Sequence, residues 1–223
     1  MSARPIEKTS CGATGSLSII RLPAPGSAGR LGLTSILERR RTTREISDKP
    51  LPLRVLSTLL WGAWGINRAR GPFGLVGRTA ASASNSQEIE LYVALEAGAY
   101  RYEPESHALI PACKGDLRPF AISAGQRKLG RRAPARLLYV ADIERLEHSR
   151  GFQEPGLCDP QVQRSYYFVD TGLIAANVYL LAAAMGLGAW FHNCDRAALS
   201  TRLGLGKRQR PLFAQTVGYP KAS

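Results

Sequence analysis

The densest set of side chains that could bind an anion lies between Arg40 and Arg44, where three arginines and two threonines are consecutive. Arginine presents a rigid fork of donors that fits a phosphate or a carboxylate at two points, and threonine adds a hydroxyl donor. This composition predicts an anion-binding segment. Most runs of basic residues are solvated surface, however, and that alternative stays open for this segment taken alone.

A second polar run contains Ser82, Ser84, Asn85 and Gln87. Their side chains supply both donors and acceptors of hydrogen bonds, which suits the edge of a flat heterocycle better than a phosphate. The alternative is an exposed loop that binds nothing.

The third motif, Gly186-Leu187-Gly188, follows a long helical pattern. It lacks the GxGxxG spacing of a dinucleotide site and ends a helix instead of opening one, so a helix C-cap is the default interpretation. The chain also has no phosphate-loop spacing and no nucleophile-elbow sequence, which argues against a serine or cysteine hydrolase.

The cysteines and histidines are scattered along the chain, at Cys11, Cys113, Cys158 and Cys194 and at His107, His148 and His192. No pair has the spacing of metal ligands, so we expect no metal site. Scattered cysteines favour free thiols in a reducing compartment over a disulfide framework. The first residues also lack the pattern of a secretory signal, and together these features predict a cytoplasmic protein.

Lysine and arginine number 30 against 17 acidic residues, a formal net charge of +13 that favours acidic partners. A nucleotide cofactor, an anionic substrate or a nucleic acid would each satisfy it. The positive charge is spread out, with a denser patch at Arg127, Lys128, Arg131, Arg132 and Arg136, and no RNA-binding aromatic signature accompanies it. A basic nucleic-acid-binding protein without catalysis therefore remains an alternative of another class.

The periodicity of apolar residues predicts a mixture of helices and strands. Predicted helices start at Ser35 through a capping box, span Leu53 to Trp64 and Leu117 to Leu129, run from Gln161 to Gly186, and follow Asp195 as N-cap. Predicted strands cover Ile89 to Leu95, a hairpin at 99–102 and 108–111, Arg136 to Ala141, 189–191 and Leu212 to Val217. Residues 65–80 read as loop, and 142–160 as a polar excursion over a site.

The uncharged stretch from Thr171 to Phe191 is long enough to cross a bilayer. Its many alanines and glycines, with Asn177 inside and Asp170 beside it, favour a helix buried in a core or a subunit interface. We therefore predict an α+β fold with an N-terminal arm at 1–34, one domain at 35–223, and no membrane span.

The order of these motifs resembles the nitroreductase family of flavoproteins. The resemblance rests on Arg40-Arg41-Thr42-Thr43-Arg44, the LLWGAWGINR stretch, the run from Arg78 to Gln87, the apolar helix to Gly188, and Val217-Gly218-Tyr219-Pro220. The nearest branch is similar to the dehydrogenases that oxidise azoline rings in peptide natural products.

The resemblance implies a sandwich with a mixed, mostly antiparallel sheet flanked by helices, in an interlocked homodimer with FMN in clefts between the subunits. The apolar helix would then lie at the dimer centre. Arg40, Arg41, Thr42 and Arg44 match the family segment that binds the phosphate, ribitol and pyrimidine edge, and Ser82, Ser84 and Asn85 match one that reaches the flavin from the partner subunit. The remaining expected cofactor contacts are Gly186, Leu187, Gly188, His192, Asn193 and Lys221.

The implied activity is an oxidoreductase that passes a hydride from NADH or NADPH to flavin N5 and then to a flat nitroaromatic or quinone-like acceptor by a ping-pong route. Arg40 and Arg44 would stabilise the anionic reduced ring. A substrate-dedicated flavin dehydrogenase of the same fold is the alternative within the family.

Several positions depart from the family pattern. Ala81 replaces a proline, and His192-Asn193 replaces the acidic residue and glycine behind N5. The C-terminal basic residues are reduced to Lys221, with Lys207 and Arg208 as substitutes. Arg150-Gly151-Phe152 stands where the azoline-oxidising branch has a Lys-Tyr pair, which argues against that reaction.

Overall fold

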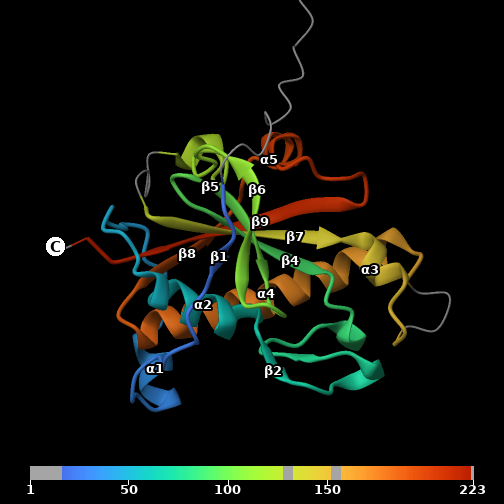
Figure 1. Cartoon of the computed structure of the whole chain (residues 1–223), viewed down its shortest axis with the longest axis horizontal. Coiled ribbons are helices and arrows are strands. Elements are labelled where there is room, and N and C mark those ends of the chain that lie inside the picture. The colour runs from blue at the N-terminus through green and yellow to red at the C-terminus, as the bar shows by residue number, and fades with distance from the viewer. Residues whose placement is uncertain (1–16, 128–132, 152–156, 222–223) are drawn as a thin grey trace, which may run out of the picture.

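The structure, a computed structural model, describes residues 17–127, 133–151 and 157–221 (Figure 1). Its centre is a sheet with the strand order β1-β6-β5-β4-β7-β9-β8, in which neighbouring strands are antiparallel. The strands are β1 (Ile20–Arg21), β4 (Ile89–Ala94), β5 (Gly98–Glu103), β6 (Ala108–Lys114), β7 (Ala135–Asp142), β8 (Gly188–His192) and β9 (Gln209–Gly218). This arrangement confirms the predicted α+β sandwich.

Helices cover both faces of the sheet. In Figure 1, α1 (Leu33–Arg39), α2 (Leu53–Trp64) and α4 (Pro160–Ala184) lie below it, and α5 (Arg196–Arg202) lies on the other side. Side chains of β4 alternate accordingly: Ile89, Leu91 and Val93 pack in the core on the side of α2 and α4, and Tyr92 packs in the core that contains Leu199 of α5. Every residue of β4 is therefore buried, although its sequence alternates as in a half-exposed strand.

The long helix α4 is the core helix of this fold. Asp159 caps it by accepting a hydrogen bond from the Gln161 N–H at 2.8 Å, and Pro160 occupies its first turn. Its length and apolar composition would allow it to cross a membrane. However, its Asn177 side chain donates to the backbone oxygens of Gly62 and Thr79, at 3.1 and 3.2 Å, as expected of a helix packed within a protein.

Several local predictions are confirmed. Helix α2 spans the predicted residues and ends at Gly65, whose N–H donates to Trp61 O. The hairpin of β5 and β6 turns at 104–107, and Asp195 caps α5 by accepting from the Ala198 N–H at 3.1 Å. The glycine after α4, Gly186, has a φ of +67° and ends that helix as predicted.

Other local predictions are wrong. Helix α1 begins at Leu33, and its N-cap Gly32 makes no side-chain cap bond, so the capping box at Ser35 does not form. Residues 65–80 are not all loop, because β2 (Ile66–Arg68) pairs with β3 (Gly77–Arg78), and η1 (Pro72–Gly74) lies between them. The polar excursion contains α3 (Ile143–Glu147), whereas its residues 152–156 lie outside the described part.

The helix predicted from Leu117 is also absent from its described residues, which end at Arg127 and contain only the short η3 (Ala124–Gln126). Leu117 and Ala121 are buried against the sheet, so the apolar spacing reflects burial. Pro119 has no backbone N–H to continue a helix. The other predicted helix residues, and Lys128, Arg131 and Arg132 of the basic patch, lie outside the described residues.

The described part of the N-terminal arm packs onto the domain. Besides forming β1, it accepts a hydrogen bond from Ser57 Oγ at Pro23 O, 2.5 Å away, and the Gly26 N–H donates to Thr58 Oγ1 at 2.9 Å. Cys113, at the end of β6, is disulfide-bonded, whereas Cys158 and Cys194 are free. The expectation that all cysteines are free is therefore wrong, because separation along the sequence says little about distance in the fold.

Candidate functional site

The basic segment leaves α1 and runs as an extended chain along the outer edge of β8. Thr42 forms a parallel bridge with Ala189, and the Thr43 N–H donates to Ala189 O at 2.9 Å. Further on, the Lys221 N–H donates to Glu45 O at 3.0 Å. A backbone hydrogen bond thus holds Lys221 next to the arginine segment, although most of the chain separates them in the sequence.

The approach of this segment to β8 depends on Gly188. A Cβ atom at that position would lie 2.6 Å from Ile46 Cδ1 and 2.9 Å from Thr43 Cγ2, closer than atoms can approach without displacement. In the motif Gly186-Leu187-Gly188, the first glycine therefore ends α4 and the last makes room for the basic segment. The sequence indicated the first role but not the second.

A cavity of about 490 Å³ lies beside this segment. Arg41, Thr43 and Glu45 line it, at alternate positions of the extended chain. Arg39, the last residue of α1, also lines it. The other lining residues are Tyr179, Ala182, Ala183, Gly186, Leu187, Pro220 and Lys221.

The intervening residues contact aromatic rings. The guanidinium carbon of Arg40 is 5.7 Å from the Tyr179 ring centre, and that of Arg44 is 5.8 Å from the Trp190 ring centre. These are cation–π distances. Arg40, Arg41 and Arg44 are exposed and form no ion pair within the described part of the chain. Their charge is therefore free to attract an anion.

Tyr179 connects these elements, and sequence reasoning missed it. Its hydroxyl accepts a hydrogen bond from the Phe191 N–H at 2.9 Å and lies 3.3 Å from Thr42 Oγ1. The ring lines the cavity and supports Arg40. The only available signal was a tyrosine among the aliphatic residues near the C-terminal end of α4, and such residues usually belong to the core.

The polar run 82–87 lies at another part of the molecule, near the middle of α4. The Ala83 N–H donates to Asp170 Oδ2 at 2.8 Å, and Asn85 Nδ2 donates to Val76 O at 3.1 Å. Ser84, Asn85 and Gln87 all have positive φ, near +50°, which is uncommon for residues other than glycine and marks strained backbone. The run is thus a defined turn held by its neighbours.

Two carboxyl groups are buried beneath this turn. Glu88 is completely buried and accepts a hydrogen bond from Ser86 Oγ at 2.6 Å, and Asp170 is almost completely buried. Burial, with the neighbouring Asp170 charge as a smaller cause, raises the pKa of Glu88 to about 8. Glu88 is therefore mostly protonated at neutral pH, while Asp170 accepts from the backbone of the turn.

Within one chain the two groups of candidates are separate. Asp170 and Tyr179 lie about 13 Å apart along α4, at the usual 1.5 Å rise per residue. None of Ser82, Ser84 and Asn85 lines the cavity beside the basic segment. A ligand that touches both groups would need a contribution from a second chain.

His192 has both ring nitrogens occupied. Nδ1 donates to Asn193 O at 3.0 Å, because a carbonyl can only accept, and Nε2 accepts from Thr216 Oγ1 at 2.8 Å. Burial lowers the pKa of His192 to about 4, so the ring is neutral at pH 7. His192 could therefore offer a ligand its backbone only, whereas the side chain of Asn193 is exposed.

The described residues contain no group of three or more side chains that could hold a metal ion.

Comparisons with known proteins agree with this architecture. Residues 37–219 match the nitroreductase family. A protein of Methanocaldococcus jannaschii assigned to the nitroreductases is 31% identical over 83% of this chain and 90% of its own. A crystal structure from Ralstonia eutropha JMP134, of a protein assigned to the same class, is 32% identical with a TM-score of 0.78, covering 99% of this chain and 97% of that one.

A chain of the E. coli microcin synthetase McbBCD complex, solved with truncated pro-MccB17, has a TM-score of 0.67 at 20% identity and covers all of this chain and 84% of its own. At that identity the likeness shows the fold alone, so the azoline-oxidising branch stays a prediction. The family match and the two relatives above 30% identity define an oxidoreductase of the general flavin-dependent type. The chain belongs to the nitroreductase family. This family generally uses a flavin with nicotinamide electron donors, and its members are typically dimers.

Proposed function

We propose that the protein is a homodimeric, FMN-dependent NAD(P)H oxidoreductase that reduces a flat acceptor such as a nitroaromatic or a quinone. The observation that carries the proposal is the basic segment at the edge of β8, whose arginines are exposed and not paired with carboxylates of the described residues. Gly188 holds this segment beside a cavity of about 490 Å³.

The donor set fits the phosphate and the heterocycle of FMN. Arg39, Arg41 and Lys221 line the cavity and supply the positive charge that a phosphate requires, against one negative charge from Glu45. Arg40 and Arg44 lie over the rings of Tyr179 and Trp190, which limits how far their guanidinium groups can move. We assign the phosphate to the first set and the pyrimidine edge to the second.

Bound FMN would supply the redox chemistry, accepting a hydride from NADH or NADPH and passing it to the acceptor in a second half-reaction. The protein would contribute position and charge. Arg40 and Arg44 would stabilise negative charge on the ring. The Tyr179 hydroxyl holds Thr42 and Phe191 in register, so it positions the segment without contacting the reacting atoms.

The proposed dimer would bury an exposed apolar face of α4. Val169 and Leu173 of this helix are 60% and 42% exposed, and Leu33 and Leu37 of α1 are 63% and 55% exposed. Such side chains commonly mark a protein interface. A partner packed there would bring its own 82–87 turn towards the basic segment, which is how we propose that Ser82, Ser84 and Asn85 reach the cofactor.

A cytoplasmic location remains part of the proposal, although the Cys113 disulfide removes one of its arguments. A substrate-dedicated dehydrogenase is the second candidate. It is favoured by the position of Arg150 beside the 82–87 turn, where the neighbouring Gly151 O accepts a hydrogen bond from Ser84 Oγ at 3.3 Å. Non-enzymatic nucleic-acid binding explains only the charge and not the organised cavity.

Purified protein should be yellow and absorb near about 450 nm, as oxidised flavin does. Colourless protein that takes up no added FMN would refute the proposal, most clearly if it bound DNA with steep salt dependence. A steady-state screen of nitroaromatic and quinone acceptors with NADH and NADPH would then separate a general reductase from a dedicated dehydrogenase.

A further inference from the structure

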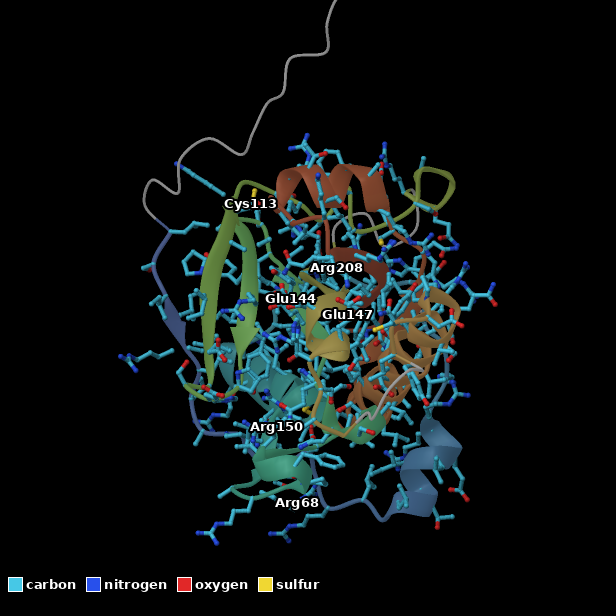
Figure 2. All side chains as sticks on the ribbon, turned by 90° about the vertical axis from the view of Figure 1, so that its right-hand side faces the viewer. Arg68, Cys113, Glu144, Glu147, Arg150 and Arg208 are labelled. Atoms are coloured by element: carbon cyan, nitrogen blue, oxygen red, sulfur yellow. The ribbon has the colours of Figure 1, made fainter. Side chains whose placement is uncertain are left out.

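A second cavity lies where two strands of the sheet separate. Strands β4 and β5 pair from Ala94↔Ala99 to Tyr92↔Arg101, and no further pair is formed between them. Beyond that point β4 continues with β7 and β5 with β6. A cavity of about 230 Å³ lies at this fork, lined by residues of both strands and by Trp64, Arg78 and Arg145. Arg145 belongs to α3, which Figure 2 shows facing the viewer at the labels Glu144 and Glu147.

Most charged side chains around this cavity form ion pairs. The buried Glu90 carboxylate pairs with Arg101 at 3.4 Å and with Arg145 at 3.3 Å, and it also accepts from Gln209 Nε2 at 2.8 Å. Arg101 further pairs with Glu103 at 3.1 Å. On α3, Arg145 also pairs with Asp142, and the neighbouring Glu147 is matched by Arg208 (Figure 2). Most charges here thus have a partner of opposite sign.

Among the buried charges of this cavity, Arg78 is the exception. Its side chain is only 9% exposed, its Nε donates to the neutral Gln87 side chain at 2.6 Å, and its guanidinium lies 5.5 Å from the Trp64 ring centre. Its Nη1 is buried without a hydrogen-bond partner among the described residues, and Arg78 forms no ion pair with any of them. Buried arginine is normally paired with an anion, because desolvating an unpaired charge is costly.

We propose that the fork of β4 and β5 is a binding site for a small monocarboxylate, which would pair with Arg78. Because Arg78 Nε is held by Gln87, the carboxylate would form a charge-assisted hydrogen bond with a terminal nitrogen of the guanidinium. The cavity is several times the roughly 30 Å³ occupied by one water molecule. Glu103 and Glu105 also line it, so a dianion such as phosphate meets more repulsion than a monoanion. The site is separate from the cavity beside the basic segment and does not depend on flavin binding.

Ligand binding would act on the 82–87 turn through Gln87. Arg78 Nε holds the side-chain oxygen of Gln87, and Arg145 Nη1 donates to its backbone oxygen at 3.2 Å. Gln87 in turn donates from its backbone to Ser82 Oγ at 3.1 Å and from its side chain to Asn85 Oδ1 at 3.0 Å. A carboxylate that fixes Arg78 therefore also restrains this turn.

The test is an NMR titration of the purified protein with sodium propionate at constant ionic strength, compared with sodium phosphate. We expect saturable shifts at Gln87 and Trp64, slower amide exchange across 82–87, and tighter binding of propionate than of phosphate. Arg78→Met should weaken propionate binding by more than about tenfold, whereas Arg70→Met, at an exposed arginine outside the cavity, should not change it. Saturable binding that survives Arg78→Met, or no saturable binding by the unmodified protein, would overturn the proposal.

A second variant keeps the test decisive if Arg78→Met does not fold. Glu105 is exposed, so Glu105→Gln should fold normally, and it removes one negative charge from the cavity. We expect the affinity for phosphate to rise severalfold relative to that for propionate. An unchanged ratio would show that the anion does not bind at this fork.

Discussion

The Asp170 carboxylate of α4 accepts a hydrogen bond from the Ala83 N–H at 2.8 Å, which anchors a strained surface turn to the core helix. The same carboxylate lies beside Glu88, whose pKa of about 8 keeps it mostly protonated at neutral pH. The geometry of the turn is therefore linked to a buried proton. This linkage predicts how stability depends on pH.

Because the pKa of Glu88 is higher in the folded protein than the usual 4.5, the folded state retains a proton that the unfolded chain releases. The contribution to stability is fully present below about pH 4.5 and is lost as pH rises towards 8. Glu88→Gln should remove this dependence, changing the pH profile of the unfolding free energy by on the order of a few kcal/mol. Urea unfolding at several pH values measures it, and parallel profiles for both proteins would contradict it.

Gly188→Ala should displace the basic segment from β8, because the added methyl group overlaps Ile46 and Thr43. We expect a loss of about 1–3 kcal/mol of stability together with weaker FMN retention. Gly32→Ala is the matched control, since a Cβ there would have no atom within 4 Å. Equal thermal stability and equal flavin content in both variants would disprove the role of Gly188.

Arg44→Ala should weaken FMN retention by roughly tenfold, the effect of losing one charge-assisted hydrogen bond to the cofactor. Its folding should be unaffected, because Arg44 is exposed, lies over the face of Trp190 and forms no ion pair with the described residues. Equilibrium dialysis with FMN gives the dissociation constant, and Arg70→Ala controls for the general loss of positive charge. If both variants retain FMN equally well, Arg44 does not contact the cofactor.

Leu173→Glu should separate the proposed dimer into monomers. Leu173 is 42% exposed in the single chain, so the substitution costs the isolated fold little, whereas a buried interface would trap the charge. Sedimentation velocity should show monomers that also lose flavin, because the partner's 82–87 turn is then absent. Thr201→Glu, on the exposed side of α5, should remain dimeric and retain flavin. A variant Leu173→Glu that stays dimeric would place the interface elsewhere.

The sequence predicted features that depend on local patterns. Leu53 to Trp64 shows helical spacing up to Gly65, and both limits of α2 agree with it. The same reasoning mistook the burial of Leu117 and Ala121 for a helix, because residues packed on a sheet can have helical spacing by coincidence. The hairpin of β2 and β3 was missed because each strand is short and rich in glycine or arginine.

The candidate site also contains residues that the sequence predicted and residues that it did not. The residue types in the sequence predicted that Arg40 to Arg44 and Gly186 to Gly188 belong to the site. The structure brings these two segments and Lys221 together. Tyr179 and the close approach of Ile46 to Gly188 could not be predicted, because they depend on how α4 and the sheet pack. Whether Ser82, Ser84 and Asn85 join the site depends on how a second chain packs against this one. The spacing of residues in the sequence carries no information about that packing.

The pairing of residues 42–46 with β8 and the C-terminal segment also affects solubility. Strand β8 is the last in the sheet order, and an uncovered terminal strand exposes backbone donors and acceptors on which other chains can add. The basic segment covers this edge through Thr42 and Thr43, and its repeated positive charges repel like chains. The residues that we propose to hold an anion would thus also protect against aggregation. Substitutions that loosen the segment should therefore lower solubility before any loss of activity can be measured.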